Sequence, residues 1–481
     1  MKKVTLFFPK TNPEDSKYES AVLAPLSLMA LASPLRADGW DVKILDNRVD
    51  DDCDRQVLDS LADSVCLGIS AMTGFQIKDG LRLAELARGQ YPDLPIIWGG
   101  YHPSSLPEQT AEHPLVDAVV RGQGEVTFGE IVEALEAGKS FDGIAGITYA
   151  KDGQVIVNPD RSLVDPNEFP PMAYDAVRLE KYIHLNRGLK AINYVSSVGC
   201  PHRCAFCSNV KVYGRRWKGL SPERVVDELE ALVKNYGIGL IFMDDNNFFI
   251  NKERVRRISE LMIERKLNLQ WFATVRAEQF IGFDEEFLNL ATQAGFIKAM
   301  VGAESGDQRI LDLASKDRTV QDAIKCAEMC KKHGIQPSFS YIFGFPFETA
   351  EEHETEMKAT LDLIKTIKQT DHNSKVTMYF FTPYPGTALF EYALKANLDV
   401  PQRLDEWAQF DPRGTVTPWI SEEEKSRIRL IVERYIEYAY PTNIFKNRFK
   451  GFTGSPRYIL HVIARYRVEH SNYALPFERL L

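Results

Sequence analysis

Three cysteines fall within eight residues of one another in the segment GCPHRCAFCSN, residues 199–209. They are Cys200, Cys204 and Cys207, and the aromatic Phe206 precedes the last of them. A structural zinc site takes four protein ligands, but no fourth cysteine is near, and His202 lies between two of the three. Three thiolates suit a 4Fe–4S cluster, whose irons are held by cysteine sulfur. One iron would then be open to a small molecule. Zinc binding is the alternative.

The bulk composition bounds the class of protein. A chain of 481 residues predicts two or three domains. Its 44% hydrophobic and 26% charged residues are typical of a globular protein with a sizeable core, and a net charge of −9 argues against a nucleic-acid partner. The longest apolar run, residues 21–35, contains two prolines and is shorter than the roughly 20 residues of a membrane span. With no signal-peptide pattern, a cytoplasmic location is expected, where thiols stay reduced.

The first 145 residues alternate short apolar runs with helical patterns. Near-continuous apolar strands separated by helices indicate a parallel sheet covered on both faces. We therefore expect a doubly wound, Rossmann-like α/β domain, which binds ligands at the carboxyl ends of its strands. The predicted strands are residues 4–9, 42–47, 64–70, 96–100 and 118–122.

A second series of strands and helices follows a hairpin and linker over residues 146–190, where Asp152-Gly153 supplies the hairpin turn. Six βα steps over residues 191–390 predict a partial (β/α)6 barrel, and residues 391–481 predict a mostly helical C-terminal extension that caps the site or binds substrate. The cysteine trio follows the first barrel strand, at the end where such barrels place their chemistry. The predicted barrel strands are residues 192–198, 239–245, 269–275, 297–305, 336–344 and 375–381.

At these residues the chain resembles the radical S-adenosylmethionine enzymes, in the CxxxCxxC spacing, the aromatic before the third cysteine and the barrel pattern. The resemblance implies that the open iron binds the amino and carboxylate groups of S-adenosylmethionine. The reduced cluster then cleaves it to methionine and a 5′-deoxyadenosyl radical. It also implies an electron donor of the flavodoxin or ferredoxin type.

Further matches to this family lie at the ends of later barrel strands, in FMDDNNFF, VRAE and GAESG. By resemblance, Arg276 would bind the carboxylate of S-adenosylmethionine, and Glu304 and Ser305 its ribose or amino-acid end. Asp244 and Asp245 match the acidic segment of the family, and Phe206 flanks the cluster. The alternatives are that Arg276 and Glu304 pair with each other across the rim, and that the two aspartates cap the next helix.

The N-terminal domain resembles the cobalamin-binding domain of one branch of this family, in residues 25–46, 68–75, 99–108 and 119–125. The resemblance implies that the nucleotide tail of cobalamin lies beside the sheet. No DxHxxG string occurs, so no protein histidine is expected on cobalt, and His102 is interpreted as a structural or tail contact. A vestigial or nucleotide-binding domain is the alternative. The implied cobalamin contacts are Ser70, Thr73, Gly99, Gly100, His102, Gly122 and Glu125.

Together these resemblances imply a methyltransferase. A 5′-deoxyadenosyl radical would abstract hydrogen from an unactivated carbon of a small-molecule, lipid or natural-product substrate, and methylcobalamin would deliver the methyl group. A second S-adenosylmethionine would then remethylate the cobalt. The alternatives are a non-methylating cyclisation or rearrangement with cobalamin as redox partner, a non-catalytic cobalamin-binding protein, and a zinc-dependent hydrolase.

Other residues have less specific patterns. Cys326 and Cys330, one helical turn apart, are interpreted as two buried small hydrophobes rather than as ligands of a second cluster. The basic, aromatic tail of residues 443–481 either contacts a membrane surface or an anionic, lipid-like substrate, or packs on the barrel with a solvated basic face. The aromatic candidates for lining a substrate cavity are Trp407, Tyr435, Tyr438 and Tyr440.

Overall fold

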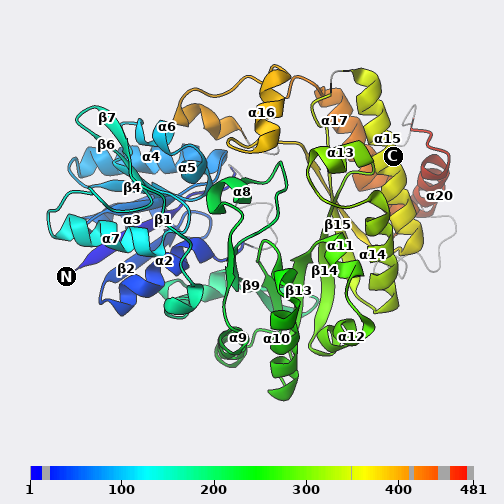
Figure 1. The fold of residues 1–481 in the computed structure, drawn as a ribbon, viewed down its shortest axis with the longest axis horizontal. Helices are drawn as coiled ribbons and strands as arrows, with labels where there is room; N and C mark the ends of the chain where they lie inside the picture. The colour runs from blue at the N-terminus through cyan, green and yellow to red at the C-terminus, as the bar shows by residue number, and fades with distance from the viewer. Residues whose placement is uncertain (1, 13–21, 348, 411–416, 442–455, 474–481) are drawn as a thin grey trace.

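The computed structural model describes residues 2–12, 22–347, 349–410, 417–441 and 456–473. Two seven-stranded sheets form two lobes, and the chain after the second sheet crosses back over the first (Figure 1). The α/β class, with a parallel N-terminal sheet and a half-barrel, is as predicted.

The N-terminal sheet has the order β2-β1-β3-β4-β5-β6-β7. Its first five strands are parallel and confirm the five predicted runs. Alternate residues of these strands are buried on opposite faces: Val4 and Leu6 pack with Leu28 and Phe128, while Phe7 packs with Val57. The strands are β1 (Lys3–Phe8), β2 (Asp41–Asp46), β3 (Leu67–Ser70), β4 (Ile96–Gly99) and β5 (Ala118–Val120). The helices are α2 (Leu26–Ala37), α3 (Cys53–Leu61), α4 (Phe75–Gln90), α5 (Tyr101–Ser105), α6 (Pro107–Ala111) and α7 (Glu125–Glu136).

The predicted hairpin is β6 (Ile147–Lys151) and β7 (Gln154–Val157). Asp152 and Gly153 both have positive φ, as a two-residue hairpin turn requires. β6 pairs antiparallel with β5, so the hairpin completes the N-terminal sheet instead of separating the domains. The linker after it contains three 3-10 turns, η1 (Pro166–Glu168), η2 (Tyr174–Ala176) and η3 (Leu179–Lys181). It is anchored to the first domain, because the Tyr182 hydroxyl donates to Asp46 at 2.9 Å.

The second sheet has the order β16-β15-β14-β13-β12-β9-β8. Six parallel strands confirm the predicted barrel strands, and β8 adds an antiparallel edge. The first predicted strand, residues 192–198, is too long: the sheet strand ends at Tyr194, and the chain then forms a separate two-stranded ribbon, β10 with β11. The strands are β8 (His184–Asn186), β9 (Leu189–Tyr194), β10 (Ser197–Gly199), β11 (Trp217–Gly219), β12 (Leu240–Met243), β13 (Gln270–Val275), β14 (Phe296–Glu304), β15 (Gln336–Phe343) and β16 (Lys375–Phe380).

Helices cover the outer face of this sheet (Figure 1). Helix α9 begins where the sequence predicts. The Ser221 hydroxyl caps it by accepting a hydrogen bond from the backbone amide of Arg224, and Pro222 is the first helical residue. Cys326 and Cys330 are both buried on α14, which confirms their interpretation as core residues. The helical segments are α8 (Ser208–Tyr213), α9 (Pro222–Tyr236), η4 (Phe248–Ile250), α10 (Lys252–Glu264), α11 (Ala277–Ile281), α12 (Glu285–Gln293), α13 (Gln308–Leu313), α14 (Val320–Lys332) and α15 (Ala350–Thr370).

The C-terminal extension is helical, as predicted, and joins both lobes. After β16, the chain returns to the N-terminal domain, where η5 lies beside α4 (Figure 1). The last described helix of the extension is α20. No helix in the described ranges combines the length and apolarity needed to cross a membrane. The elements are α16 (Ala388–Lys395), η5 (Leu404–Gln409), α17 (Glu422–Arg429), the π-helical η6 (Leu430–Ile436), α18 (Glu437–Ala439) and α20 (Pro456–Glu469).

Candidate active site between the two lobes

The three cysteines lie on a loop that other parts of the barrel hold in place. Cys200 follows β10, and Cys207 is the N-cap residue of α8. The Ala205 amide donates to the carbonyl of Ala314, and the Ala205 carbonyl accepts from the Leu389 amide, both at 2.9 Å. The loop is therefore fixed by backbone bonds to α13 and α16 as well as by its own sequence.

The thiols are partly buried. Burial raises the pKa of the Cys200 and Cys207 thiols, while the backbone amides of His202 and Asn209 oppose that rise. Within the described part of the chain, no three Cys, His, Asp or Glu side chains lie close enough to share one metal ion. Each thiolate of a 4Fe–4S cluster binds a different iron, so its ligands need more separation than those of a single zinc ion.

Arg276 brings positive charge to the cysteine loop. Its Nη1 atom lies 3.2 Å from the Cys204 Sγ atom. The same guanidinium donates to the Glu278 carboxylate and to the Lys316 carbonyl. Arg276 is thus placed beside the cysteines, where the resemblance places the carboxylate of S-adenosylmethionine.

Glu304 and Lys316 form a buried ion pair beneath the same loop. Lys316 Nζ lies 2.8 Å from Glu304 Oε1, and the side chains are only 8% and 7% exposed. The Lys316 ammonium also lies 5.5 Å from the centroid of the Phe206 ring. The alternative that Arg276 and Glu304 pair with each other is therefore wrong. Glu304 has a φ of 60°, a strained conformation for a side-chain-bearing residue, at the register shift between β14 and β15.

Ser305 points away from the cysteine loop, into the interface between β14 and α15. Its hydroxyl lies 3.2 Å from Glu356 Oε1 and 3.0 Å from Thr360 Oγ1. The whole residue, backbone included, is buried, so Ser305 joins β14 to α15 and offers no exposed atom to a ligand at the rim.

Glu356 gives this network a pH dependence. Burial raises the pKa of its carboxyl to about 7, above the ~4.3 of an unfolded chain. The folded state then retains a proton that the unfolded state loses, so this carboxyl destabilises the fold as pH rises from about 4.3 through 7. We expect the unfolding temperature of Glu356→Gln to fall less than that of the wild type between about pH 5 and 8. Parallel curves from thermal denaturation at stepped pH would contradict this assignment.

The two aspartates after β12 have different roles, and neither caps the next helix. Asp245 is buried and accepts hydrogen bonds from the Ser196 amide and hydroxyl and from the Ser197 hydroxyl, which orders the segment before Cys200. Asp244 is exposed, and its carboxylate accepts from Asn193 Nδ2 at 3.3 Å. The caps of η4 and α10 are Asn247 and Asn251, so the capping alternative is wrong.

Small residues line the carboxyl edge of the N-terminal sheet. Ser70, Gly99, Gly100 and Gly122 are all partly exposed there. Gly100 has a φ of 101°, and a Cβ atom at this position would lie 2.7 Å from the Ala71 carbonyl oxygen. The Gly100 contact is with the protein's own backbone and fixes the turn after β4, while the small, partly exposed residues at this edge fit a bulky group lying across it, as the cobalamin interpretation needs.

His102 is enclosed by protein, whereas Glu125 is partly exposed at the start of a helix. The His102 Nδ1 atom lies 3.0 Å from Thr73 Oγ1, its ring packs against Trp407, and burial lowers its pKa to about 3, so the imidazole is neutral. Glu125 is the first residue of α7, and burial raises the pKa of its carboxyl. His102 therefore fits the structural interpretation better than that of a ligand directed at the edge of the sheet.

Tyr101 is a residue of the site that the sequence did not indicate. Its hydroxyl donates to Asn209 Oδ1 at 3.1 Å, and Asn209 and Asn246 exchange hydrogen bonds at 2.7 and 3.1 Å. The network joins α5 of the first lobe to the cysteine loop and to the segment after β12. In Figure 1, α5 and α8 lie side by side. The carboxyl ends of the two sheets thus meet at the cysteines.

Trp407, one of the four aromatic candidates for lining a substrate cavity, is instead packed between the extension and the first lobe. It is 1% exposed, and its indole nitrogen donates to Gln109 at 2.6 Å, which fastens η5 to the N-terminal domain. Tyr435 and Tyr440 are buried as well, whereas Tyr438 is partly exposed. The Tyr440 hydroxyl accepts a hydrogen bond from the side-chain amide of Gln369 on α15.

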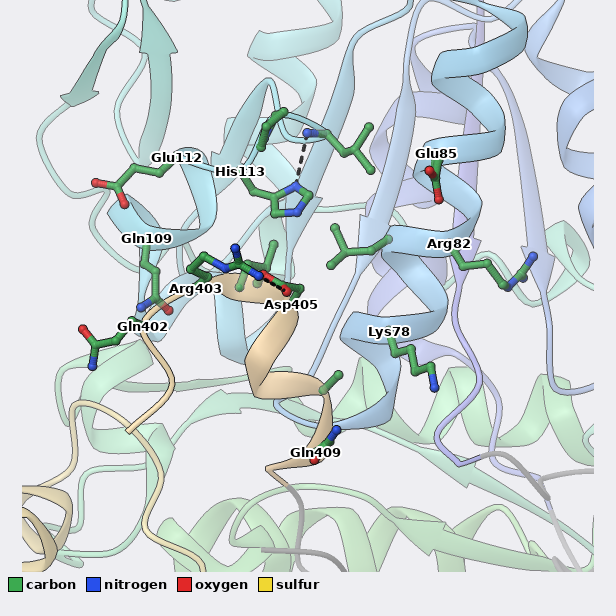
Figure 2. A pocket seen from close by; sticks show the side chains of 15 residues that line it. Lys78, Arg82, Glu85, Gln109, Glu112, His113, Gln402, Arg403, Asp405 and Gln409 are labelled. Atoms are coloured by element: carbon green, nitrogen blue, oxygen red, sulfur yellow. Dashed lines mark hydrogen bonds and ion pairs between the residues drawn. The ribbon is translucent and has the colours of Figure 1, made fainter. Parts of the chain in front are cut away.

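A cavity of about 850 Å³ lies on the outer flank of the first lobe, between α4, α6 and η5 (Figure 2). Its polar side chains include His113, which accepts from the Leu115 amide, and the exposed pair Arg403–Asp405. None of the predicted site residues lines it. It is separate from the candidate active site.

Known proteins resemble this chain over nearly its whole length. The model of the radical SAM superfamily matches residues 194–359, and the model of the B12-binding domain matches residues 20–132. An uncharacterised methyltransferase of Pyrococcus horikoshii is 33% identical over 93% of this chain and 95% of its own length. The anaerobic magnesium-protoporphyrin IX monomethyl ester cyclase of Rubrivivax gelatinosus is 29% identical over 76% of this chain and 66% of its own length.

A solved structure shares the fold. The cobalamin-dependent S-adenosylmethionine radical enzyme OxsB, determined with aqua-cobalamin and S-adenosylmethionine bound, superposes with a TM-score of 0.74 at 19% identity. The superposition covers 100% of this chain and 74% of that one. The two-lobed arrangement is therefore found in an experimental structure.

Proposed function

Because the chain belongs to the radical S-adenosylmethionine enzymes that carry a cobalamin-binding domain, we propose that it transfers a methyl group to an unactivated carbon of a small molecule. The cofactors of this family are a 4Fe–4S cluster, S-adenosylmethionine and cobalamin. When bound, they supply the cleavage of S-adenosylmethionine to a 5′-deoxyadenosyl radical and the transfer of a methyl group. Methylation is preferred to cyclisation because the relative that is 33% identical is named a methyltransferase.

The observation that supports the proposal most is the meeting of the two carboxyl edges at the cysteines. The Tyr101–Asn209 hydrogen bond joins the small-residue edge of the first sheet to the helix that follows Cys207. A radical and a methyl donor must act on one substrate carbon, so their sites have to face a common space. The carboxyl edges of the two sheets both face the cysteine loop, and this arrangement would provide the common space.

Within this proposal, each rim residue has a task set by its chemistry. Cys200, Cys204 and Cys207 would hold the cluster, with Phe206 and Lys316 covering one side of the loop. Arg276 is the cation for the carboxylate of S-adenosylmethionine, because guanidinium binds carboxylates in a fixed, two-point geometry. The exposed Asp244 carboxylate is available to ribose hydroxyls.

At the first sheet, Ser70, Gly99, Gly100 and Gly122 would leave space for cobalamin, and Thr73 supplies a hydroxyl. Glu125 and Thr73 are held by neighbouring protein groups. We expect no protein histidine on cobalt, since His102 packs against Trp407.

Partners follow from the same chemistry. The cluster needs an external one-electron donor, for which we propose a flavodoxin or ferredoxin in the cytoplasm. We also propose that α20 lies near a membrane surface or a lipid-like substrate, because Tyr458, Ile459, Val462 and Tyr466 are exposed along it. The rest of the basic, aromatic tail, residues 443–455 and 474–481, lies outside the described residues.

The test uses S-adenosylmethionine labelled in its methyl group. We expect anaerobic incubation of the reduced holoenzyme with a small-molecule extract of the producing cells to place label in one extract compound, with 5′-deoxyadenosine released in parallel. Both signals should be absent with a Cys204→Ala variant. If 5′-deoxyadenosine accumulates while the altered compound carries no label, methyl transfer is excluded and a radical cyclisation or rearrangement takes its place.

A further inference from the structure

The inner face of the barrel sheet is open to solvent, whereas the outer face is not. Strand residues that point outward, such as Ile241, Trp271 and Ala299, are fully buried under helices. Their neighbours that point inward, including Phe242, Phe272 and Met300, are partly exposed, and Tyr379 is 49% exposed. This face extends downward from the rim that holds Glu304.

One row of side chains on this face combines aromatic rings with a cation. Phe242, Phe272 and Lys298 are register partners across β12, β13 and β14. The two phenyl rings stack with centroids 5.0 Å apart and an angle of 15°. Lys298 Nζ lies 5.4 Å from the centroid of the Phe272 ring. The register shift between Trp271 and Phe272 is what brings Lys298 opposite Phe272.

Positive charge is concentrated at this row. Burial, together with the charges of Arg187 and Lys375, lowers the pKa of Lys298. Arg187, in the β8–β9 turn, donates to Gln336 Oε1 at 2.6 Å, and Gln336 is the register partner of Lys298 on β15. In the part of the chain that the structure describes, none of these three cations forms an ion pair with an acid.

Lys298 and Lys375 are partly buried and Arg187 is exposed, so the cost of like-charge repulsion and of lost hydration falls mainly on Lys298. An anion bound among them would relieve both costs. The stacked rings beside Lys298 add an apolar surface that a hydrocarbon or aromatic body can cover. The combination fits a ligand with an apolar body and an anionic end.

The row lies at different depths below the rim on different strands. Lys298 precedes Glu304 by six residues on β14, which corresponds to about 20 Å of strand, whereas Phe242 precedes Asp244 by only two residues on β12. A ligand on the row can therefore reach the rim along β12 while its anionic end lies at Lys298.

We propose that the inner face of the barrel binds a largely apolar or aromatic substrate through an anionic group held by Lys298, Arg187 and Lys375. The proposal rests on the proposed function, since it assigns the substrate class of that site. The reactive carbon lies near the rim, and the Phe242–Phe272 pair contacts the body of the molecule.

The test compares two probes of nearly the same shape, 1-pyrenebutyrate and 1-pyrenebutanol, by equilibrium dialysis against the full-length, cluster-containing protein. We expect the carboxylate to bind on the order of tenfold more tightly than the alcohol. In Lys298→Met the preference should disappear while the alcohol binds as before. Phe272→Leu should weaken the binding of both probes. The control is Lys325→Met, on the exposed face of α14, which should preserve the preference.

Equal binding of the two probes to the wild type would overturn the proposal, as would an unchanged preference in Lys298→Met. If Lys298→Met does not fold, Lys375→Met on the edge strand β16 should reduce the preference and serves in its place. The outcome is independent of catalysis. A chain that binds the carboxylate selectively but releases no 5′-deoxyadenosine would refute the proposed function and leave this site standing.

Discussion

Replacement of Cys204 by alanine is expected to reduce 5′-deoxyadenosine release to the level of a protein-free control. With two thiolates left, the loop cannot hold a three-cysteine cluster, and there is no iron to which S-adenosylmethionine can chelate. Iron and sulfide content and the visible charge-transfer absorption of the anaerobically reconstituted protein should fall together.

The matched control for this prediction is Cys326→Ala. Cys326 is buried on α14 beside Cys330, remote from the loop in sequence and packed as a core residue. This variant should keep full iron content and lose about 1 kcal/mol of stability through the removed sulfur. Iron content that falls equally in both variants would mean that the helix cysteines hold metal and are not simply core residues.

Lys316→Met is expected to lower the free energy of unfolding by about 3–5 kcal/mol, because it leaves the Glu304 carboxylate buried without its partner. The side chains of Glu304 and Lys316 are only 7% and 8% exposed, so water cannot replace the missing ammonium. The double variant Lys316→Met/Glu304→Gln should recover part of the loss, since the uncompensated charge is then gone. Urea denaturation of the three proteins measures the difference.

A surface pair provides the comparison for this effect. Lys234 lies 2.7 Å from Glu230 on α9, with its side chain 69% exposed. Lys234→Met should cost less than about 1 kcal/mol, because solvent screens an exposed pair. If Lys316→Met is no more destabilising than Lys234→Met, or if the double variant is no more stable than the single one, the ion pair does not hold the rim together.

Local sequence spacing was sufficient to predict most of the elements and the type of metal site. The strands of both sheets are runs of apolar residues whose pattern is set within a few positions, and the Asp152-Gly153 turn and the Ser221 cap depend on neighbours in the chain. The cysteine trio is equally local. Such features depend on backbone conformation and on side chains within one turn or strand, and these interactions are encoded by adjacent residues.

The partners of the charged and polar site residues were decided by the tertiary structure. Tyr101 and Asn209 are 108 positions apart, and Trp407 lies 298 positions from Gln109. Likewise, Glu304 forms its ion pair with Lys316 and not with Arg276, because the bulge in β14 orients its side chain. Ser305 hydrogen-bonds to Glu356 because α15 packs against β14 at this position. A one-residue shift in register reverses the face on which a side chain lies. The spacing of residues along the chain does not indicate where such a register shift occurs. The long-range contacts of these site residues could therefore be identified only in the folded structure.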